Sequence, residues 1–186
     1  MGLNISGIVI DKNYSDNLSE LESIIGEKLL FEKEVIFEDT CDSFKEDGYC
    51  DIFFSKKGTF VLLTMEKGGF EFYAKNQDVF SFVLSEMTMT FCINYVKNGE
   101  NIRTIMEAEG EVMENEGVPF EFEKEEDDKA EIIYHLIEKT LGESFHEIEL
   151  DAKCLRYSFI ETEKSAEKTS TENNTTKEDK PWWEFW

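Results

Sequence analysis

The dipeptide Asn98-Gly99 lies between two segments in which apolar and polar residues alternate, and it constrains the fold more than any other feature. A two-residue turn of type I′ needs positive φ at both central positions, which asparagine and glycine tolerate best. Alternation with a period of two indicates strands, here around Phe91 and Ile102. Glu109-Gly110 then predicts a second turn into a short strand around Val112. The middle of the chain is therefore predicted to form an antiparallel meander.

Further strands and two helices are expected on both sides of this meander. Strands are predicted at SGIVI near the start, at EVIFED, on both sides of the Ser55–Gly58 turn, and at KCLRYSFI. One helix is predicted in NLSELESII, ended by Gly26, and another in KAEIIYHLIEKTL, ended by Gly142. The expected fold is α+β: a single antiparallel sheet of hairpins and meander, with two helices packed on one face.

The composition changes sharply after residue 160. Residues 161–180 are mostly Ser, Thr, Asn, Glu and Lys, and such a segment buries too little apolar surface to offset its ordering entropy. We predict a globular α+β domain over residues 1–160, a disordered acidic and polar linker over 161–180, and an aromatic anchor motif, PWWEFW, over 181–186.

The formal net charge of −23, from 42 acidic and 19 basic residues, restricts the partners of this chain. Nucleic acid is not expected, because phosphates would be repelled and the sequence has no basic stripe. Anionic membrane surfaces are disfavoured for the same reason. The charge favours a basic protein partner or simply high solubility.

The acidic residues concentrate between Glu107 and Asp128, where eleven carboxylates accompany the single base Lys124. Like charges side by side cost free energy, so a patch this dense indicates a cationic partner. Glu107, Glu109 and Glu111 are spaced two apart, which predicts that they share one face of a strand-and-turn ribbon. The alternatives are a solvated turn with an acid-rich helix start, or a Ca²⁺ or Mg²⁺ site, although no EF-hand pattern is present. The candidate partner-binding residues here are Glu107, Glu109, Glu111, Glu114 and Glu116.

The aromatic end of the chain supplies a second set of candidate partner-binding residues. The motif contains every tryptophan in the sequence. Tryptophan is enriched among the residues that dominate binding energy at interfaces. The motif could fold back on its own domain, join two copies of the chain into a homo-oligomer, or dock into another protein; an unbound tail is the remaining alternative. The residues concerned are Trp182, Trp183, Phe185 and Trp186.

No recognisable catalytic or cofactor motif is present in the sequence. Patterns for a serine nucleophile, a phosphate-binding loop, a dinucleotide site or a zinc protease are missing. His135 is predicted to lie opposite the apolar stripe of its helix, and His146 follows the helix end. Ser85-Glu86 is interpreted as a polar interruption within a strand. We therefore predict no enzymatic activity, no cofactor and no metal.

The four cysteines do not follow zinc-binding spacing, since no C-x-x-C pair occurs among them. We expect reduced thiols in a cytoplasmic protein, with a Cys41–Cys50 disulfide as the alternative. The N-terminal residues have neither the basic nor the apolar segment of a signal peptide, and no run approaches the length of a membrane span.

The stretch from Leu84 to Glu123 resembles a family of uncharacterised bacterial cytoplasmic proteins. The matching features are an S-E-x-[ST] strand, an aromatic-rich hairpin and an E-G-x-P segment, followed by a helix and a closing strand. In this chain the motif residues are Ser85, Glu86, Gly110, Glu116, Gly117 and Pro119. The likeness covers roughly residues 1 to 160 and implies a bacterial cytoplasmic protein, without catalytic residues.

These observations lead to two functional hypotheses. The first is a non-enzymatic protein-binding protein, most plausibly an immunity or inhibitor partner of a basic bacterial protein. The second is an adaptor or scaffold whose PWWEFW motif recruits a partner. A divalent-metal-dependent enzyme that uses the acidic cluster is a distant alternative.

Overall fold

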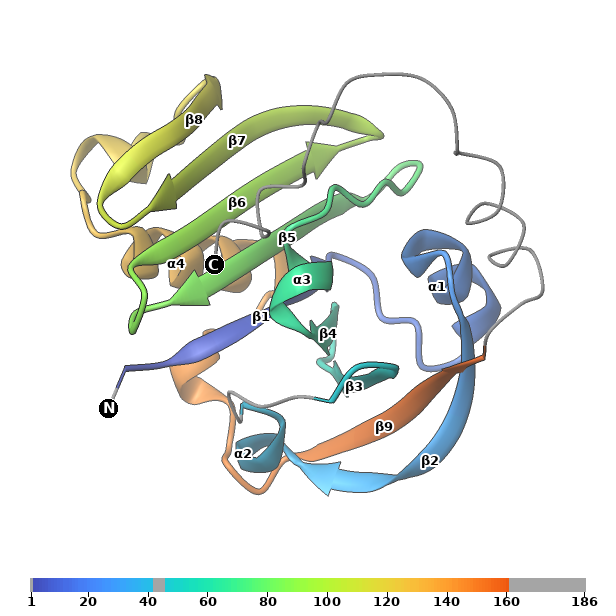
Figure 1. Cartoon of the computed structure of the whole chain (residues 1–186). Coiled ribbons are helices and arrows are strands. Elements are labelled where there is room, and N and C mark those ends of the chain that lie inside the picture. Colours follow the sequence, from blue (N-terminus) through green and yellow to red (C-terminus); the bar gives the residue numbers. More distant parts are fainter. Residues whose placement is uncertain (1, 42–45, 161–186) are drawn as a thin grey trace, which may run out of the picture.

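The computed structural model describes residues 2–41 and 46–160 (Figure 1). Its centre is one nine-stranded antiparallel sheet with the strand order β2-β9-β3-β4-β1-β5-β6-β7-β8. The predicted linker and the aromatic anchor lie outside the described residues. The strands are β1 (Asn4–Ile10), β2 (Lys28–Ile36), β3 (Tyr49–Phe54), β4 (Thr59–Leu63), β5 (Asp78–Ser85), β6 (Thr90–Lys97), β7 (Glu100–Ala108), β8 (Glu111–Gly117) and β9 (Lys153–Ile160).

The predicted meander is confirmed as strands β5 to β8, which pair in sequence order. Asn98 and Gly99 have φ values of 52° and 85°, as a type I′ turn requires. Glu109 and Gly110 repeat this geometry with φ values of 54° and 79°. The local turn chemistry therefore fixes the connections on this half of the sheet.

The two predicted helices are also present, as α1 (Leu18–Ile25) and α4 (Lys129–Leu141). The Asp128 carboxylate accepts a hydrogen bond from the Ala130 N–H at 2.8 Å, which caps the start of α4. Gly26 and Gly142 end the two helices in the left-handed conformation. Four shorter helical segments complete the described chain: α2 (Phe37–Thr40), α3 (Met65–Gly68), η1 (Glu121–Lys124) and η2 (Phe145–Glu147).

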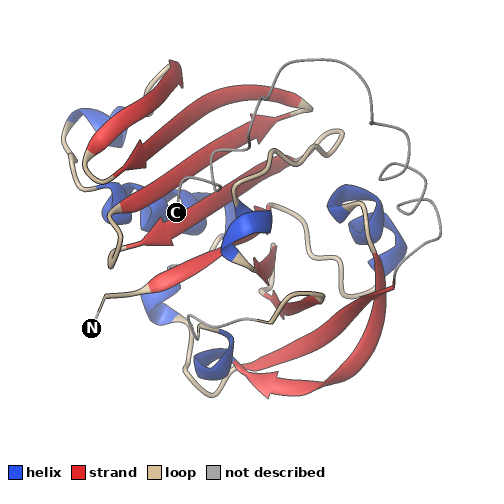
Figure 2. Cartoon of the chain, viewed as in Figure 1, coloured by secondary structure: helices blue, strands red, loops and turns tan. Residues whose placement is uncertain are grey.

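The placement of the helices corrects one detail of the expected fold, because α1 and α4 cover opposite faces of the sheet. Ile5 and Val9 of β1 belong to the cluster that contains the buried side of α4. Ile8 and Ile10 belong to a second cluster, which contains Leu21 of α1. Figure 2 shows α4 behind the sheet and the short α3 in front of it.

The physical reason lies in the central strands, which are apolar on both sides. All seven residues of β1 and all five of β4 are buried. A strand of this kind needs cover on each face, whereas a half-exposed antiparallel strand needs only one. The consecutive Ile8, Val9 and Ile10 in the sequence are the local signal of this double burial.

The cysteines follow the same division between the two faces. Cys50 lies in the cluster beneath α1, whereas Cys41 packs against the cluster beneath α4. All four cysteines are thiols, so the alternative Cys41–Cys50 disulfide is wrong. The sheet itself separates the two side chains.

A buried ion pair joins β3 to β9 near one end of the sheet. The Arg156 guanidinium donates from Nε and Nη2 to the two oxygens of Asp51, at 2.7 and 2.9 Å. Asp51 is fully buried, and Arg156 is about one quarter exposed. The hydrogen bonds to the Asp51 carboxylate raise the pKa of Arg156, so the guanidinium stays charged.

Replacing Asp51 by alanine is expected to lower the free energy of unfolding by about 3 kcal/mol, because it leaves the Arg156 charge without its partner. Urea unfolding of the Asp51→Ala variant measures this loss. Asp16→Ala, at an exposed position, serves as the control and is expected to change stability by less than about 0.5 kcal/mol. Equal stability of the two variants would contradict the structural role of the pair.

Candidate partner-binding edge

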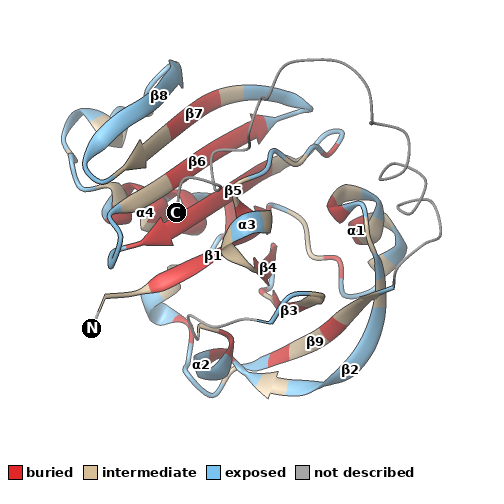
Figure 3. Ribbon diagram, viewed as in Figure 1, coloured by how far each residue is buried: buried red, intermediate tan, exposed pale blue. Residues whose placement is uncertain are grey.

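Strand β8 forms one edge of the sheet and carries three of the five glutamates predicted to bind a partner. All seven of its residues are exposed, on both faces, as the pale-blue strand in Figure 3 shows. Its sequence EVMENEG holds three glutamates and no basic residue. One side of its backbone pairs with β7, and the other side faces no strand of the described chain. We call Glu109, Glu111, Glu114 and Glu116 the acidic edge.

The register with β7 decides which glutamates share a face. Glu111 is opposite Ala108, Glu114 is opposite Met106, and Glu116 is opposite Thr104. Directly opposed residues of an antiparallel pair project to the same side, so these glutamates lie together on the face away from α4. The structure thus brings Glu111, Glu114 and Glu116 into one row.

Glu107 does not belong to this row, which corrects the expectation that Glu107, Glu109 and Glu111 share one face. The two-residue turn at Glu109-Gly110 pairs Ala108 with Glu111, and Glu107 is then opposite Val112. Glu107 consequently faces α4, where its carboxylate lies 3.9 Å from the Lys129 Nζ and is mostly buried. The expectation failed because the side chains of turn residues do not alternate between the two faces as those of a strand do.

A β-bulge interrupts β8, because the register shifts between the Glu107–Val112 and Met106–Glu114 pairs. Met113 is the extra residue, and its side chain is 65% exposed. Bulges and charges on an edge strand oppose pairing with an unselected second strand. Pairing of the acidic edge with a second acidic strand is therefore disfavoured.

Arg103 on β7 holds the acidic edge in place. Its Nη1 donates to the Asn115 Oδ1 at 2.7 Å and to the Glu116 carbonyl oxygen at 2.8 Å, both on β8. Its Nε and Nη2 donate to the Glu123 carboxylate of η1, with a shortest distance of 2.6 Å. The side chains of Arg103 and Glu123 are only 3% and 5% exposed. One guanidinium therefore fixes both β8 and the following segment.

This role of Arg103 was not predicted, since the sequence showed it only as a polar residue within the meander. The available signal was its rarity, because the chain contains two arginines among 19 basic residues. Both arginines bind buried or nearly buried carboxylates. The planar guanidinium makes several hydrogen bonds in fixed directions, which a lysine cannot reproduce.

The carboxylates of the acidic edge are not neutralised within the part of the chain that the structure describes. No lysine or arginine there forms an ion pair with Glu109, Glu111, Glu114 or Glu116. The nearby Lys124 binds Glu121 instead, in an exposed pair. Among the described residues, the acidic edge therefore has no basic side chain paired with it.

The other residues singled out in the sequence have structural surroundings. Ser85 is buried, and its hydroxyl donates to the Asn4 side chain at 2.7 Å. The Glu86 carboxylate accepts the Leu3 N–H at 2.7 Å. His135 is exposed beside the Phe122 ring, and His146 packs on aromatic rings after α4. The four aromatic candidates, Trp182, Trp183, Phe185 and Trp186, lie outside the described residues.

The described residues include one buried thiol with a raised pKa and no grouped metal ligands. Burial raises the pKa of the Cys92 thiol to about 11, so this cysteine is almost entirely protonated at neutral pH. No three His, Cys, Asp or Glu side chains are grouped to hold a metal ion within residues 2–41 and 46–160. No described helix is both long enough and apolar enough to span a bilayer.

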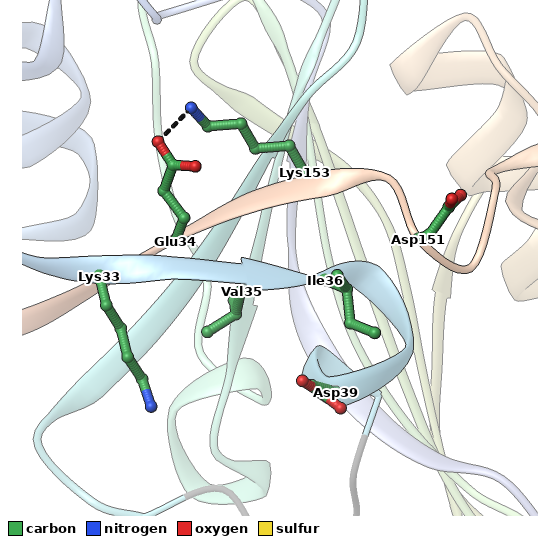
Figure 4. Close-up of a pocket in the computed structure, with 7 residues that line it drawn as sticks. All are labelled: Lys33, Glu34, Val35, Ile36, Asp39, Asp151 and Lys153. Atoms are coloured by element: carbon green, nitrogen blue, oxygen red, sulfur yellow. Dashed lines mark hydrogen bonds and ion pairs between the residues drawn. The ribbon is translucent and has the colours of Figure 1, made fainter.

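An open hollow beside α2 and the end of β2 offers mixed charge rather than a catalytic arrangement. Figure 4 shows the seven residues that line it, with Lys33 and Val35 on one side of β2 and Glu34 on the other side, next to Lys153. Glu34 and Lys153 form an exposed ion pair. The hollow is lined by three carboxylates and two ammonium groups, from Glu34, Asp39, Asp151, Lys33 and Lys153, so its charge is mixed.

Comparisons with family models, with curated protein sequences and with solved structures find no match for this chain.

Arg103→Ala is expected to destabilise the protein by about 3 kcal/mol, because Glu123 stays buried without its partner. Backbone hydrogen exchange of β8 and η1 should accelerate more than that of β1, since only the former segments contact Arg103. Lys124→Ala, which removes an exposed pair in the same segment, is the matched control and should leave both measurements nearly unchanged. Uniform acceleration across the sheet would contradict a local anchoring role.

Proposed function

We propose that this chain is a non-enzymatic protein-binding protein that takes a basic protein partner at the acidic edge. An immunity or inhibitor protein directed at a basic bacterial protein is the function class that fits best. The observation that carries this proposal is the exposed row of Glu111, Glu114 and Glu116 on an edge strand, for which no described lysine or arginine supplies a counter-charge.

The acidic edge has two properties that a basic partner can use. Its charge, within a chain of net charge −23, would steer a cationic surface toward it and raise the association rate. Its outer backbone groups are available to an extended segment, which would gain main-chain hydrogen bonds as well as charge contacts. Val112 and Met113, 57% and 65% exposed, add apolar contact area on the same strand.

The rigidity of the edge also supports binding. Arg103 fixes the β8 backbone through Asn115 and Glu116, so the carboxylates are held on an ordered strand. A preorganised surface loses less conformational entropy on association than a flexible one. The metal-dependent alternative has no comparable support, since the described carboxylates form no metal-binding group.

Charge reversal on the row tests the proposal directly. Wild-type protein and the Glu114→Lys/Glu116→Lys variant would be used as baits in a bacterial lysate at low and raised salt. The wild type should retain a basic protein at low salt, and the variant should lose at least about tenfold of it. Glu66→Lys/Glu100→Lys, two exposed positions off the edge, gives the same net charge as the variant and should keep the partner. Equal loss in both variants would show that only net charge matters.

The adaptor hypothesis is separated from this proposal by a deletion. Removing residues 181–186 takes away every tryptophan of the chain and leaves the acidic edge intact. A partner held by the acidic edge should remain bound to the shortened chain. Loss of the partner on deletion, with retention by the charge-reversal variant, would instead assign recruitment to PWWEFW.

A further inference from the structure

The opposite edge of the sheet, strand β2, differs from β8 in its chemistry. It carries two lysines and two glutamates, so the strand is neutral within a chain of net charge −23. It also exposes large apolar side chains, with Leu30 and Phe31 at 54% and 52%. A neutral, partly apolar strand edge is a template for pairing with another strand.

Part of this edge is already occupied by the chain itself. The Leu29 N–H donates to the Glu22 carboxylate of α1 at 2.9 Å, and Lys28 pairs with the same carboxylate. After Ile36 the chain turns into α2, where the Phe37 N–H donates to the Ala152 carbonyl oxygen. No other described segment pairs with the outer side of residues 30–35, which we call the free part of the edge.

The side chains of this free part alternate between faces except at a β-bulge. The register shifts between Phe31, opposite Tyr157, and Lys33, opposite Arg156, so Glu32 is the extra residue. The Glu32 carboxylate accepts a hydrogen bond from Ser158 at 2.6 Å. Ser158 is opposite Leu30, which places Leu30 and Glu32 on the same face.

The other half of the segment mirrors this arrangement. Val35 packs in the cluster beneath α4, and Figure 4 shows Lys33 and Val35 projecting on one side of the strand with Glu34 on the other. Phe31 lies on the opposite face, with its ring 5.8 Å from that of Tyr157. Leu30, Glu32, Lys33 and Val35 therefore lie on one face of the sheet, and Phe31 and Glu34 lie on the other. This pattern is symmetric about the Glu32–Lys33 bond.

We propose that a second copy of this chain pairs with β2, antiparallel, about a two-fold axis at the Glu32–Lys33 bond. A two-fold interface places residue i of one copy opposite residue j of the other and j opposite i. Glu32 then faces Lys33 twice, Leu30 faces Val35 twice, and Phe31 faces Glu34 twice. Every opposed pair lies on one face of the continued sheet, as antiparallel pairing requires.

Charge selects this register over its neighbours. A shift of one residue in either direction places Glu32 opposite Glu32 or Lys33 opposite Lys33 on the axis. Like charges directly opposed destabilise a strand pair, whereas opposite charges and apolar pairs stabilise it. In the proposed register, Leu30 of the second copy also meets Val35 at the hollow beside α2.

The same reasoning excludes the acidic edge as the self-association surface, because β8 holds three glutamates and no base. Pairing through β2 leaves the acidic edge free at the far end of the sheet. The inference stands independently of the proposed function. Salt distinguishes the two, since screening relieves the repulsion between two copies of charge −23 but weakens the attraction of a basic partner.

Sedimentation velocity of the full chain at physiological and raised salt tests the proposal. The wild type should dimerise, and more tightly at raised salt. Glu32→Lys and Lys33→Glu each replace two attractive pairs by two repulsive pairs, and each should weaken dimerisation at least about tenfold. The double variant restores opposite charges across the axis and should recover dimerisation to within about threefold of the wild type.

Two exposed positions away from β2 supply matched controls, Glu100→Lys and Lys56→Glu, which change net charge equally and should leave the dimer intact. Circular dichroism verifies that each variant is folded. A wild type that stays monomeric at both salt concentrations overturns the proposal. A dimer that ignores the single variants, or that the double variant fails to restore, places the second copy on another surface and overturns it equally.

Discussion

Burial of the central strands on both faces is the constraint on which the rest of the structure depends. Strands β1 and β4 have no exposed residue, so neither face of the sheet centre is left to water. Each face therefore requires its own helix, and α1 and α4 are committed to opposite sides. The two clusters that result share strands but not helices. The protein is a three-layer arrangement rather than a helical layer on a half-exposed sheet.

This constraint also explains why the edges are the surfaces free for interaction. With both faces covered at the centre, exposed residues of the sheet collect on β2 and β8 at its ends. Both edge strands contain a β-bulge, which limits unselective pairing. Their charges differ, with three glutamates on β8 and a balanced set on β2, so the two edges suit different partners. The two proposed interaction surfaces therefore lie at opposite ends of one sheet.

The two arginines show how the fold tolerates charge in its interior. Arg156 joins β3 to β9 through Asp51, and Arg103 joins β7 to β8 and η1 through Glu123. Each guanidinium makes several directed hydrogen bonds, which compensates for part of the desolvation that burial imposes. A buried pair of this kind helps to fix the register of an edge strand, because the side chains of such a strand make few packing contacts. The acidic edge owes its fixed geometry to this arrangement.

Local chemistry predicted the elements of this fold well. Asn98-Gly99, Glu109-Gly110, Gly26 and Gly142 need positive φ, and such requirements act over a few residues that the sequence displays directly. The acidic run was also visible as a run. The sequence did not show that these acidic residues divide between two faces of the sheet. The turn at Glu109-Gly110 places Glu107 on the face toward α4 and Glu111 on the face away from it. The spacing of residues in the sequence predicts which face of a sheet they share only within one continuous strand.

The sequence by itself determined the meander, the turns and the two long helices, and its charge argues against nucleic acid as a partner. It did not determine the bounds of β2, because EVIFED was predicted as a strand and its second half, Phe37–Asp39, lies in α2. Only the tertiary structure decided which face each helix covers, which strands become edges, and which carboxylates meet arginine. Turn and cap preferences are set by neighbouring residues, whereas strand order and pairing depend on contacts between segments far apart in the chain. The pairing of Asp51 with Arg156, for example, joins residues that no local pattern connects.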